Sequence, residues 1–355
     1  MDKMIDLRSD TVTFPTEEMQ KAIANAQLGD DVFREDPTVN ELEGKAAKIL
    51  GKEAGLLVPS GTMGNLASLL TNCQRGTELL LGDKSHTFYY EAGGISAFGG
   101  IHSRQLKNQP NGTIKISDIQ SAIRVDNVHF PKTSAITLEN THNLCNGSPL
   151  SPEYTRDVAN IAHSNDMKLH IDGARIFNAA VALDVDVKDL VANADSVTFC
   201  LSKGLSAPVG SVICGNEKFI YHARRNRKAL GGGMRQAGII AAAGIVSLDQ
   251  MFEQIREDHI NAKLLAEGIA NIEGLFIDGE NIKSNILYFH IEKGKTRSEK
   301  LAKQTKNRDQ YPFAIKLNNI HFFESRPSCF RLVTHYGITG EDVAKTLVVL
   351  EQMLK

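Results

Sequence analysis

The chain has 355 residues, of which 42% are hydrophobic and 23% charged, and its 40 basic and 42 acidic residues leave a formal net charge of −2. This composition excludes a disordered chain, because it provides enough apolar side chain for a large core. The balanced charge argues against a surface that binds polyphosphates, so we expect no nucleic-acid partner. At roughly 150 residues per domain, the length favours two domains.

The chain carries no pattern typical of export, membrane insertion or a metal cluster. The first ten residues, MDKMIDLRSD, contain no apolar core, so we expect no signal peptide. The apolar run 237–248 is too short to cross a bilayer, and we expect no membrane partner. The five cysteines form no C-x-x-C pair, which fits a reducing cytoplasm better than a disulfide framework. The eleven histidines form no H-x-x-x-H pair, so we predict no metal site.

Helical and strand-like segments alternate along the first 250 residues. Helices that begin at a proline or a capping residue are predicted at 15–29, 36–51, 60–70 and 152–164. Short apolar strands are predicted at 55–59, 78–81, 135–138, 168–171, 196–201 and 209–214. Such strands separated by helix-length segments indicate an α/β fold, with a mostly parallel sheet flanked by helices in a large domain over 1–248.

The pattern changes after about residue 250. The expected elements are a charged amphipathic helix at 251–270, a strand at 285–291, a Lys-rich helix near 296–306, a strand at 330–334 and a final helix from 341. We therefore expect a small C-terminal α+β domain over 249–355.

The first strand end with unusual chemistry is Ser60-Gly61-Thr62, where the strand at 55–59 turns into a helix. In an open parallel sheet, ligands bind at the carboxyl ends of the strands. Free N–H groups at a helix N-terminus and two hydroxyls would suit a phosphate. A tight turn with a capping serine explains the same residues equally well.

Two further strand ends carry a carboxylate and an amine. Asp172 follows the strand 168–171, and Lys203 follows the strand 196–201. Taken alone, Asp172 is more simply a helix cap, and Lys203 a side chain that extends to the surface. Pyridoxal 5′-phosphate, however, needs a lysine for its aldehyde, an anion for its ring nitrogen and a dipolar site for its phosphate. The three strand ends together match that set.

The chain also resembles the low-specificity L-threonine aldolases, which are fold-type-I pyridoxal-phosphate enzymes. The stretches that carry the resemblance are IDLRSDTVTFPT (5–16), GDDVFREDPTVNELE (29–43), PSGTMGN (59–65), HTFYYEAGG (86–94), LENTHN (138–143), HIDGARIFNA (170–179), CLSKGLSAPVGS (200–211), RKALGGGMRQAG (227–238) and RLVTH (331–335). They follow the family order over nearly the whole chain. The segment LCNGSP (144–149) departs from it, and the region 293–330 does not align.

The resemblance implies pyridoxal 5′-phosphate as cofactor and assigns the residues that hold it. Lys203 would bond to the cofactor aldehyde, and Asp172 would keep the ring nitrogen protonated. The phosphate would be held by Ser60, Gly61 and Thr62. His86 would lie on the face of the ring; without the resemblance, it is more simply a histidine at a helix start with a local hydrogen bond.

The resemblance also implies how the substrate binds. Arg175, which would also contact the cofactor, and Arg331 would hold the substrate carboxylate, and Ser9 would add a hydroxyl. A planar guanidinium binds a carboxylate through two parallel hydrogen bonds and so sets the orientation of the substrate. From the sequence alone, both arginines are equally consistent with surface positions.

The implied reaction is the retro-aldol cleavage of L-threonine, L-allo-threonine and related β-hydroxy-α-amino acids to glycine and an aldehyde. A histidine suits the base that takes the β-hydroxyl proton, because its usual pKa lies near neutrality. His86 and His129 are both candidates, as is a water molecule that they hold. The alternatives are a β-eliminating amino-acid lyase of the same fold and a non-catalytic phosphate-binding module.

The resemblance further implies a homo-oligomer, a dimer or a dimer of dimers, with sites shared between chains. Lys228 and Arg235 flank three consecutive glycines, 231–233, and are the candidates to reach a neighbouring subunit. Glycines allow such a segment a close backbone approach. A flexible connector with a solvated basic face explains the same segment.

Overall fold

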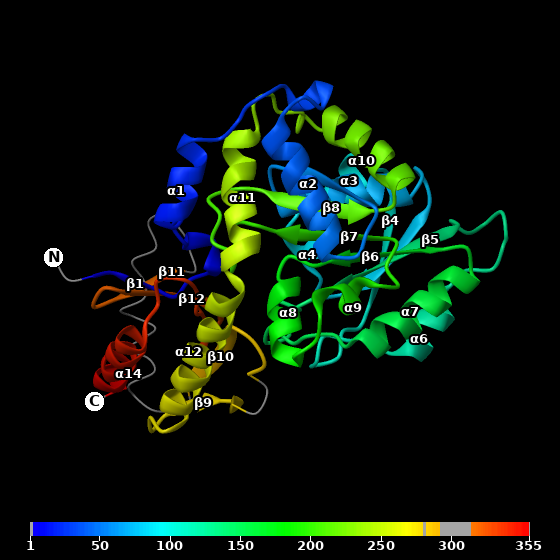
Figure 1. The fold of residues 1–355 in the computed structure, drawn as a ribbon. Coiled ribbons are helices and arrows are strands. Elements are labelled where there is room, and N and C mark those ends of the chain that lie inside the picture. Colours follow the sequence, from blue (N-terminus) through cyan, green and yellow to red (C-terminus); the bar gives the residue numbers. More distant parts are fainter. Residues whose placement is uncertain (1–2, 280–281, 292–313, 355) are drawn as a thin grey trace.

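Two β-sheets organise the chain in the computed structural model, which describes residues 3–279, 282–291 and 314–354 (Figure 1). The helices are α1 (Glu17–Ala24), α2 (Pro37–Ile49), α3 (Gly61–Asn72), α4 (His86–Tyr89), α5 (Gly94–Ala97), α6 (Ile116–Ala122), α7 (Pro152–Ser164), α8 (Ile176–Leu183), α9 (Val187–Val191), α10 (Glu217–Ala229), α11 (Gly238–Gln250), α12 (Phe252–Ala270) and α14 (Gly340–Leu354). Short 3₁₀ helices span Asp10–Val12 and Asp31–Phe33.

The first sheet has seven strands in the order β2-β8-β7-β6-β5-β3-β4. They are β2 (Ala54–Val58), β3 (Glu78–Gly82), β4 (His102–Leu106), β5 (Thr133–Glu139), β6 (Lys168–Asp172), β7 (Ser196–Cys200) and β8 (Ser211–Gly215). The five strands β7, β6, β5, β3 and β4 run parallel to one another, and β8 is antiparallel to both β2 and β7. The predicted α/β class with a mostly parallel sheet is confirmed.

Helices cover both faces of this sheet, and the strand residues alternate between them. On β2, Leu57 packs into the core that includes α2, α7, α8 and α9. Its neighbours Leu56 and Val58 pack on the opposite face, against α3 and α10. Because both faces are buried, the strands read as continuous apolar runs, and every residue of β3, β7 and β8 is buried.

The second sheet has the order β1-β12-β13-β10-β9, with β11 also paired to β12. Its strands are β1 (Ile5–Asp6), β9 (Leu275–Ile277), β10 (Ile286–Ile291), β11 (Ala314–Leu317), β12 (Ile320–Arg326) and β13 (Cys329–Val333). All the pairs are antiparallel except β1–β12. Residues of α12 and α14 pack on this sheet in a second core with Phe289, Phe322 and Phe330. This small α+β unit has the predicted character.

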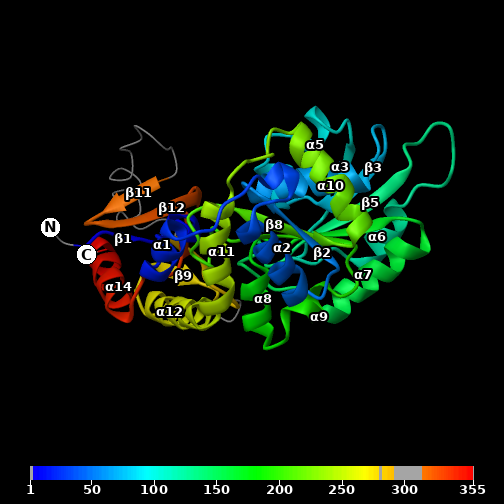
Figure 2. The same cartoon turned by 45° about the horizontal axis from the view of Figure 1, so that its top comes forward.

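The N-terminal strand belongs to the second sheet, although the sequence places it with the first domain. Ile5 pairs with Ile320, and Asp6 pairs with His321. The chain then crosses to α1, which packs beside α11 between the two sheets (Figures 1 and 2). The division at residue 248 stays a prediction, but the first residues tie the two units together.

Most helix and strand bounds agree with the predicted ones to within a few residues, but α1 ends earlier than expected. It stops at Ala24, because the side chain of Asn25 donates to the carbonyl of Lys21 at 2.7 Å and competes with further turns. Gly29, the predicted stop, instead lets the chain approach the carbonyl of Glu35 more closely than a Cβ would allow. The predicted helix near 296–306 lies outside the described residues.

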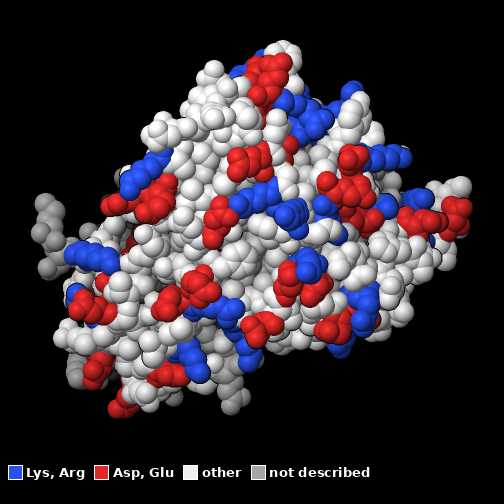
Figure 3. All heavy atoms as spheres, in the orientation of Figure 1, with Lys and Arg blue, Asp and Glu red and all other residues white. Residues whose placement is uncertain are grey.

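The surface mixes charges of both signs. The face shown in Figure 3 carries Lys and Arg interspersed with Asp and Glu, without a large area of one sign. This distribution fits the near-neutral total charge. Within the described residues, no helix combines the length and the apolar character that a bilayer crossing requires.

Candidate active site

A pocket of about 680 Å³ lies between the two sheets, at the carboxyl ends of the parallel strands. It brings together five of the predicted site residues, which are Ser9, His86, Arg175, Lys203 and Arg331. The other lining residues are Thr11, Tyr90, Asn143, Leu144, Tyr288, Phe323, Glu324 and Ser325. The first sheet and its loops provide the lysine and histidine, while the second sheet provides Arg331 and Tyr288.

Asp172 and Lys203 follow neighbouring parallel strands. Asp172 ends β6 opposite Thr198 of β7, and Lys203 lies in the turn after β7. Asp172 is buried, and its Oδ1 accepts from the backbone N–H of Ala174 at 3.2 Å. The Lys203 carbonyl accepts from the N–H of Ser206 at 2.8 Å, which closes the turn. The predicted adjacency of these two strand ends is therefore present.

A chain of hydrogen bonds links Asp172 to His86 through two residues that the sequence did not identify. The Nδ2 of Asn65 donates to Asp172 Oδ2 at 2.9 Å and to Glu91 Oε1 at 2.8 Å. Glu91 Oε1 also lies 2.9 Å from Nδ1 of His86. One polar atom from each of His86, Glu91 and Asp172 lies within 4.8 Å of the other two, so these side chains form a compact polar cluster.

Two histidines contact this cluster, His86 through Glu91 and His170 through Asn65, and their pKa values are shifted in opposite directions. Burial lowers the pKa of His86, but the hydrogen bond to Glu91 and the charge of Asp172 outweigh it and hold the pKa above its usual value. Burial and the charge of Asp172 raise the pKa of Glu91 against the hydrogen bonds from His86 and Asn65. His170 is fully buried, and burial lowers its pKa to about 4, so it is neutral.

The start of α3 has the character expected of a phosphate site. Ser60 caps the helix and accepts from the N–H of Met63 at 3.2 Å. A Cβ on Gly61 would lie 2.8 Å from Sγ of Cys200, so the first turn packs directly against the end of β7. In the described part of the chain, the buried hydroxyls of Ser206 and Ser211 have no hydrogen-bond partner. The hydroxyl of Ser211 lies 3.8 Å from that Cβ position, and an unpaired donor beside a helix N-terminus fits an anionic group.

Arg331 is held by two hydrogen bonds that leave one donor unpaired. Its Nη1 donates to the carbonyl of Arg8 at 3.0 Å, and its Nη2 donates to Asn143 Oδ1 at 2.9 Å. Tyr288 donates to the carbonyl of Asn143 at 3.2 Å. The Nε of Arg331 is buried and has no partner among the described residues. A guanidinium with a free donor in a pocket fits a carboxylate ligand.

Arg175 is buried and does not occupy the surface position that the sequence alone also allowed. It lies at the entrance of α8 and is buried, with its Nε and Nη2 each 2.6 Å from an oxygen of Asp10. Ser9, the neighbour of Asp10, donates to Asp10 Oδ1 at 3.3 Å and accepts from the N–H of Thr11. Arg175 and Ser9 therefore line the pocket as one bonded unit.

Seven predicted residues do not line this pocket. Four of them, Ser60, Gly61, Thr62 and Asp172, are described above, and the other three are His129, Lys228 and Arg235. His129 is in the exposed segment between α6 and β5, which projects from the body of the protein (Figure 1). Its backbone N–H bonds only to the side chain of Asn127. Arg235 pairs with Asp30 at 2.9 Å on the surface, and Lys228 is near the end of α10. Within a single chain, none of the three reaches Lys203.

Several polar residues of the site were missed in the sequence. Glu139 ends β5 as Asp172 ends β6, and its two oxygens accept from the N–H groups of His86 and Asn143, each at 2.8 Å. Its position at a parallel strand end was a usable signal. Asn65, Glu91 and Asp10 gave no such signal, because each meets its partners only through packing.

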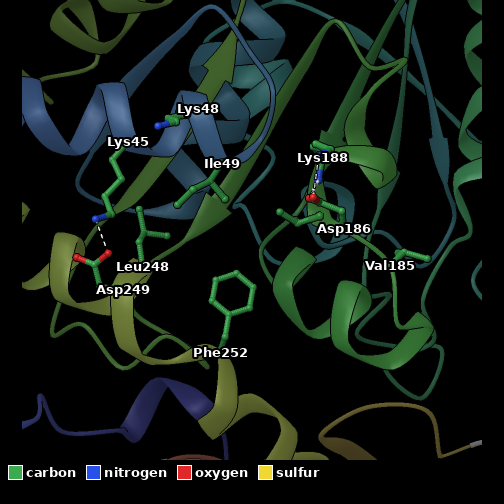
Figure 4. Close-up of a pocket in the computed structure, with 10 residues that line it drawn as sticks. Lys45, Lys48, Ile49, Val185, Asp186, Lys188, Leu248, Asp249 and Phe252 are labelled. Atoms are coloured by element: carbon green, nitrogen blue, oxygen red, sulfur yellow. Dashed lines mark hydrogen bonds and ion pairs between the residues drawn. The ribbon is translucent and has the colours of Figure 1, made fainter.

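A second hollow of about 650 Å³ lies between α2, α9 and the junction of α11 with α12. Figure 4 shows Lys45 paired with Asp249 and Lys188 paired with Asp186, around Ile49, Leu248 and Phe252. The described part of this hollow has no cluster of histidine, cysteine and carboxylate ligands. We therefore place the active site in the pocket around Lys203.

Comparison with known proteins shows the family of the chain. The chain matches the beta-eliminating lyase family over residues 6–292. It is 46% identical to low-specificity L-threonine aldolase 1 of Arabidopsis thaliana, over 99% of this chain and 97% of that protein. It is 40% identical to the low specificity L-threonine aldolase of Escherichia coli K12, over 96% of this chain and 97% of that one.

The fold has a close counterpart among solved structures. A threonine aldolase from Leishmania major superposes with a TM-score of 0.81 at 17% identity, covering 99% of this chain and all of that one. At this identity the likeness concerns the fold alone, and it includes both the large sheet and the smaller second unit.

Proposed function

Because the chain belongs to the beta-eliminating lyase family and, within it, to the low-specificity L-threonine aldolases, we propose that it is a carbon–carbon lyase. Its substrates are L-threonine, L-allo-threonine and related β-hydroxy-α-amino acids, which it cleaves to glycine and an aldehyde. The observation that carries this proposal is the convergence of Lys203, the Asp172 cluster and Arg331 on one pocket.

The residues present fit pyridoxal 5′-phosphate. Lys203 would bond to its aldehyde, Asp172 would face its ring nitrogen, and Ser60, Gly61 and Thr62 would hold its phosphate. Support for the last assignment comes from the N-terminus of α3 and from the unpaired hydroxyl of Ser211 nearby. When bound, this cofactor supplies an electron sink for the carbanion left at Cα.

Arg331 and Arg175 bind the substrate carboxylate in this proposal, and Ser9 assists. Arg331 offers an unpaired Nε, and Asn143 and the Arg8 carbonyl restrict its rotation. A carboxylate held between rigid guanidinium groups has one orientation, so the Cα–Cβ bond is presented in a fixed direction. The second sheet thus takes part in selecting α-amino acids through Arg331, while the first sheet supplies Arg175 and carries the chemistry.

His86 is the base placed for this reaction within one chain. Its Nδ1 faces Glu91, and Nε2, on the other side of the ring, has no hydrogen-bond partner within the described residues. Nε2 therefore takes the β-hydroxyl proton, directly or through a water molecule that it holds. His129 reaches a pocket only if its projecting segment enters another subunit.

We also propose that the protein is a homo-oligomer. Support comes from the exposed aromatic rings of Phe88, Tyr89, Tyr90 and Phe98, of which Tyr90 lines the pocket. The segment from Lys228 to Arg235 also lies outside the pocket of its own chain. In this proposal it contributes to the site of a partner subunit, as the projecting segment with His129 does. The five free, buried cysteines fit a cytoplasmic location.

The experiment that tests the function is incubation of the purified protein with L-threonine and with L-allo-threonine. Acetaldehyde and glycine in equal amounts are the expected products. L-serine tests the alternative, since a β-eliminating lyase would release pyruvate and ammonia from it. Pyruvate without glycine would replace the aldolase by that lyase, and the absence of any turnover would favour a binding module.

A further inference from the structure

We propose that Glu91 is a positioning residue that acts through His86. It fixes which nitrogen of the imidazole faces the pocket, and it stabilises the protonated ring after the proton has been taken. This inference rests on the proposed aldolase function, in which His86 is the base. It adds a residue that touches neither the substrate nor the cofactor lysine in the arrangement described above.

The direction of each hydrogen bond around Glu91 follows from the neutral His170. Its Nδ1 lies 2.9 Å from Oγ of Ser196, and its Nε2 lies 3.2 Å from Oδ1 of Asn65. An amide oxygen only accepts, so Nε2 carries the proton of His170. This contact sets the orientation of the Asn65 amide, and both its N–H groups point at carboxylates.

Glu91 is therefore an acceptor from two sides. Its Oε1 receives one N–H of Asn65, while the other goes to Asp172. The remaining contact of Oε1, with His86 Nδ1 at 2.9 Å, needs a proton on Nδ1. The neutral His86 is then the Nδ1–H tautomer, with the lone pair on Nε2. A carboxylate that orients a histidine in this manner also stabilises the imidazolium.

The groups that face this pair include charges of both signs. Asp172 adds negative charge near both His86 and Glu91, and Lys203 adds positive charge near His86. Glu139 accepts from the backbone N–H of His86 and not from its ring. Because Asp172 opposes the ionisation of Glu91, a cation beside Asp172 relieves that repulsion. A protonated cofactor ring would therefore favour the ionised Glu91 that orients His86.

The test replaces the charge and keeps the shape. In Glu91→Gln, the amide oxygen still accepts from Asn65 and His86, but the negative charge is gone. Histidine C2 hydrogen–deuterium exchange, measured by mass spectrometry, reports the pKa of His86 independently of turnover. The expected pKa is lower than in the unmodified protein by about one pH unit or more.

The same tryptic peptide, 85–104, contains an internal control. The exchange profile of His102, an exposed residue in the same peptide, should be identical in both proteins. A second control is Asp195→Asn, which removes the carboxylate from the pair between the exposed His163 and the partly buried Asp195 and should leave both His86 and kcat unchanged.

The kinetic result should separate orientation from binding. We expect kcat of Glu91→Gln for threonine to fall by roughly tenfold to a hundredfold, with KM within about threefold. The acid limb of the kcat profile should move to lower pH, because a base with a lower pKa loses its proton earlier. Glu91→Asp, which keeps the charge on a shorter side chain, should hold the His86 pKa near its original value and still lower kcat.

The outcomes distinguish this inference from the function on which it rests. An unchanged His86 pKa in a folded Glu91→Gln protein overturns the inference, whether or not kcat falls. Full kcat in Glu91→Asp overturns the orienting role even if Glu91→Gln does not fold. If the unmodified protein releases no aldehyde from threonine, the aldolase proposal fails, while the pKa measurement still decides whether Glu91 controls His86.

Discussion

Asp10 and Arg175 form a buried ion pair with two hydrogen bonds, Nε to Oδ2 and Nη2 to Oδ1, each 2.6 Å long. Asp10 comes from the N-terminal segment, which continues from the strand of the second sheet, and Arg175 from the loop after β6 of the first. The pair therefore joins the two halves of the pocket. It also compensates the charge of an arginine that would otherwise be buried alone.

Asp10→Asn should weaken both the fold and the substrate site. Removing one partner leaves a buried, uncompensated guanidinium, so we expect the free energy of unfolding to fall by about 3–5 kcal/mol. Denaturant unfolding measures this change, and KM for threonine should rise because Arg175 loses its orientation. Asp186→Asn, in the exposed Asp186–Lys188 pair, is the matched control and should change stability by less than about 1 kcal/mol. Equal effects of the two substitutions would contradict the assignment.

Lys203→Ala should abolish covalent attachment of the cofactor. Borohydride reduction of the unmodified protein should fix the cofactor to the peptide that contains Lys203, because a lysine–aldehyde adduct is reducible. Mass spectrometry of the digested protein checks this. Lys188 is an exposed lysine paired with Asp186, and Lys188→Ala is the control. After reduction, this variant should carry the cofactor on the same peptide as the unmodified protein. Cofactor still trapped on the Lys203→Ala chain would place the attachment elsewhere.

Asp172→Asn should keep part of the cofactor and lose most of the activity. An amide cannot stabilise a protonated ring nitrogen electrostatically, and we expect kcat to fall by about 10²-fold or more. The absorbance of the bound cofactor measures occupancy separately from turnover. Near-normal kcat at full occupancy would show that another group faces the ring nitrogen.

Asp258 should make stability depend on pH. It is buried on α12 beside Asp10, and burial raises its pKa to about 7 against one hydrogen bond from Gln254. An unfolded aspartate titrates near pH ~3.9, so between these values the folded protein binds a proton that the unfolded chain does not. Stability should therefore fall as pH rises from about 4 to about 7 and level off above.

Asp258→Asn should remove that slope and stabilise the protein at pH 8 by on the order of 2 kcal/mol. Urea unfolding at a series of pH values measures it. Glu267→Gln, at an exposed position of α12 where Glu267 pairs with Lys263, should keep the slope of the unmodified protein. The same slope in Asp258→Asn would show that another group titrates.

A shared active site should reveal itself by complementation. Mixing an inactive Lys203→Ala chain with an inactive Arg235 or Lys228 variant, under conditions of subunit exchange, should restore activity, because one site in a mixed oligomer would receive every group. Light scattering at assay concentration checks the assembly. A fully active monomer would show that these residues act in their own chain or not at all.

The features that the sequence predicts are those that depend on residues close to one another along the chain. Asp36 caps α2 as expected, because its side chain accepts from Val39 only three residues away. The placement of Asp172 beside Lys203 was predictable for a related reason, since each follows a buried strand of a parallel sheet. Glu139 obeys the same rule after β5 and was overlooked.

The sequence by itself determined the α/β class, the capped helices and the strand ends that carry Asp172 and Lys203, because these depend on local periodicity and on residues close along the chain. Only the tertiary structure decided that Asp10 binds Arg175 and that Asn65 joins Asp172 to Glu91. These partners lie far apart in the chain, and their pairing depends on how buried polar groups find acceptors once the helices pack. For the same reason the tertiary structure, and not any local pattern, placed His129 outside the pocket and β1 in the second sheet.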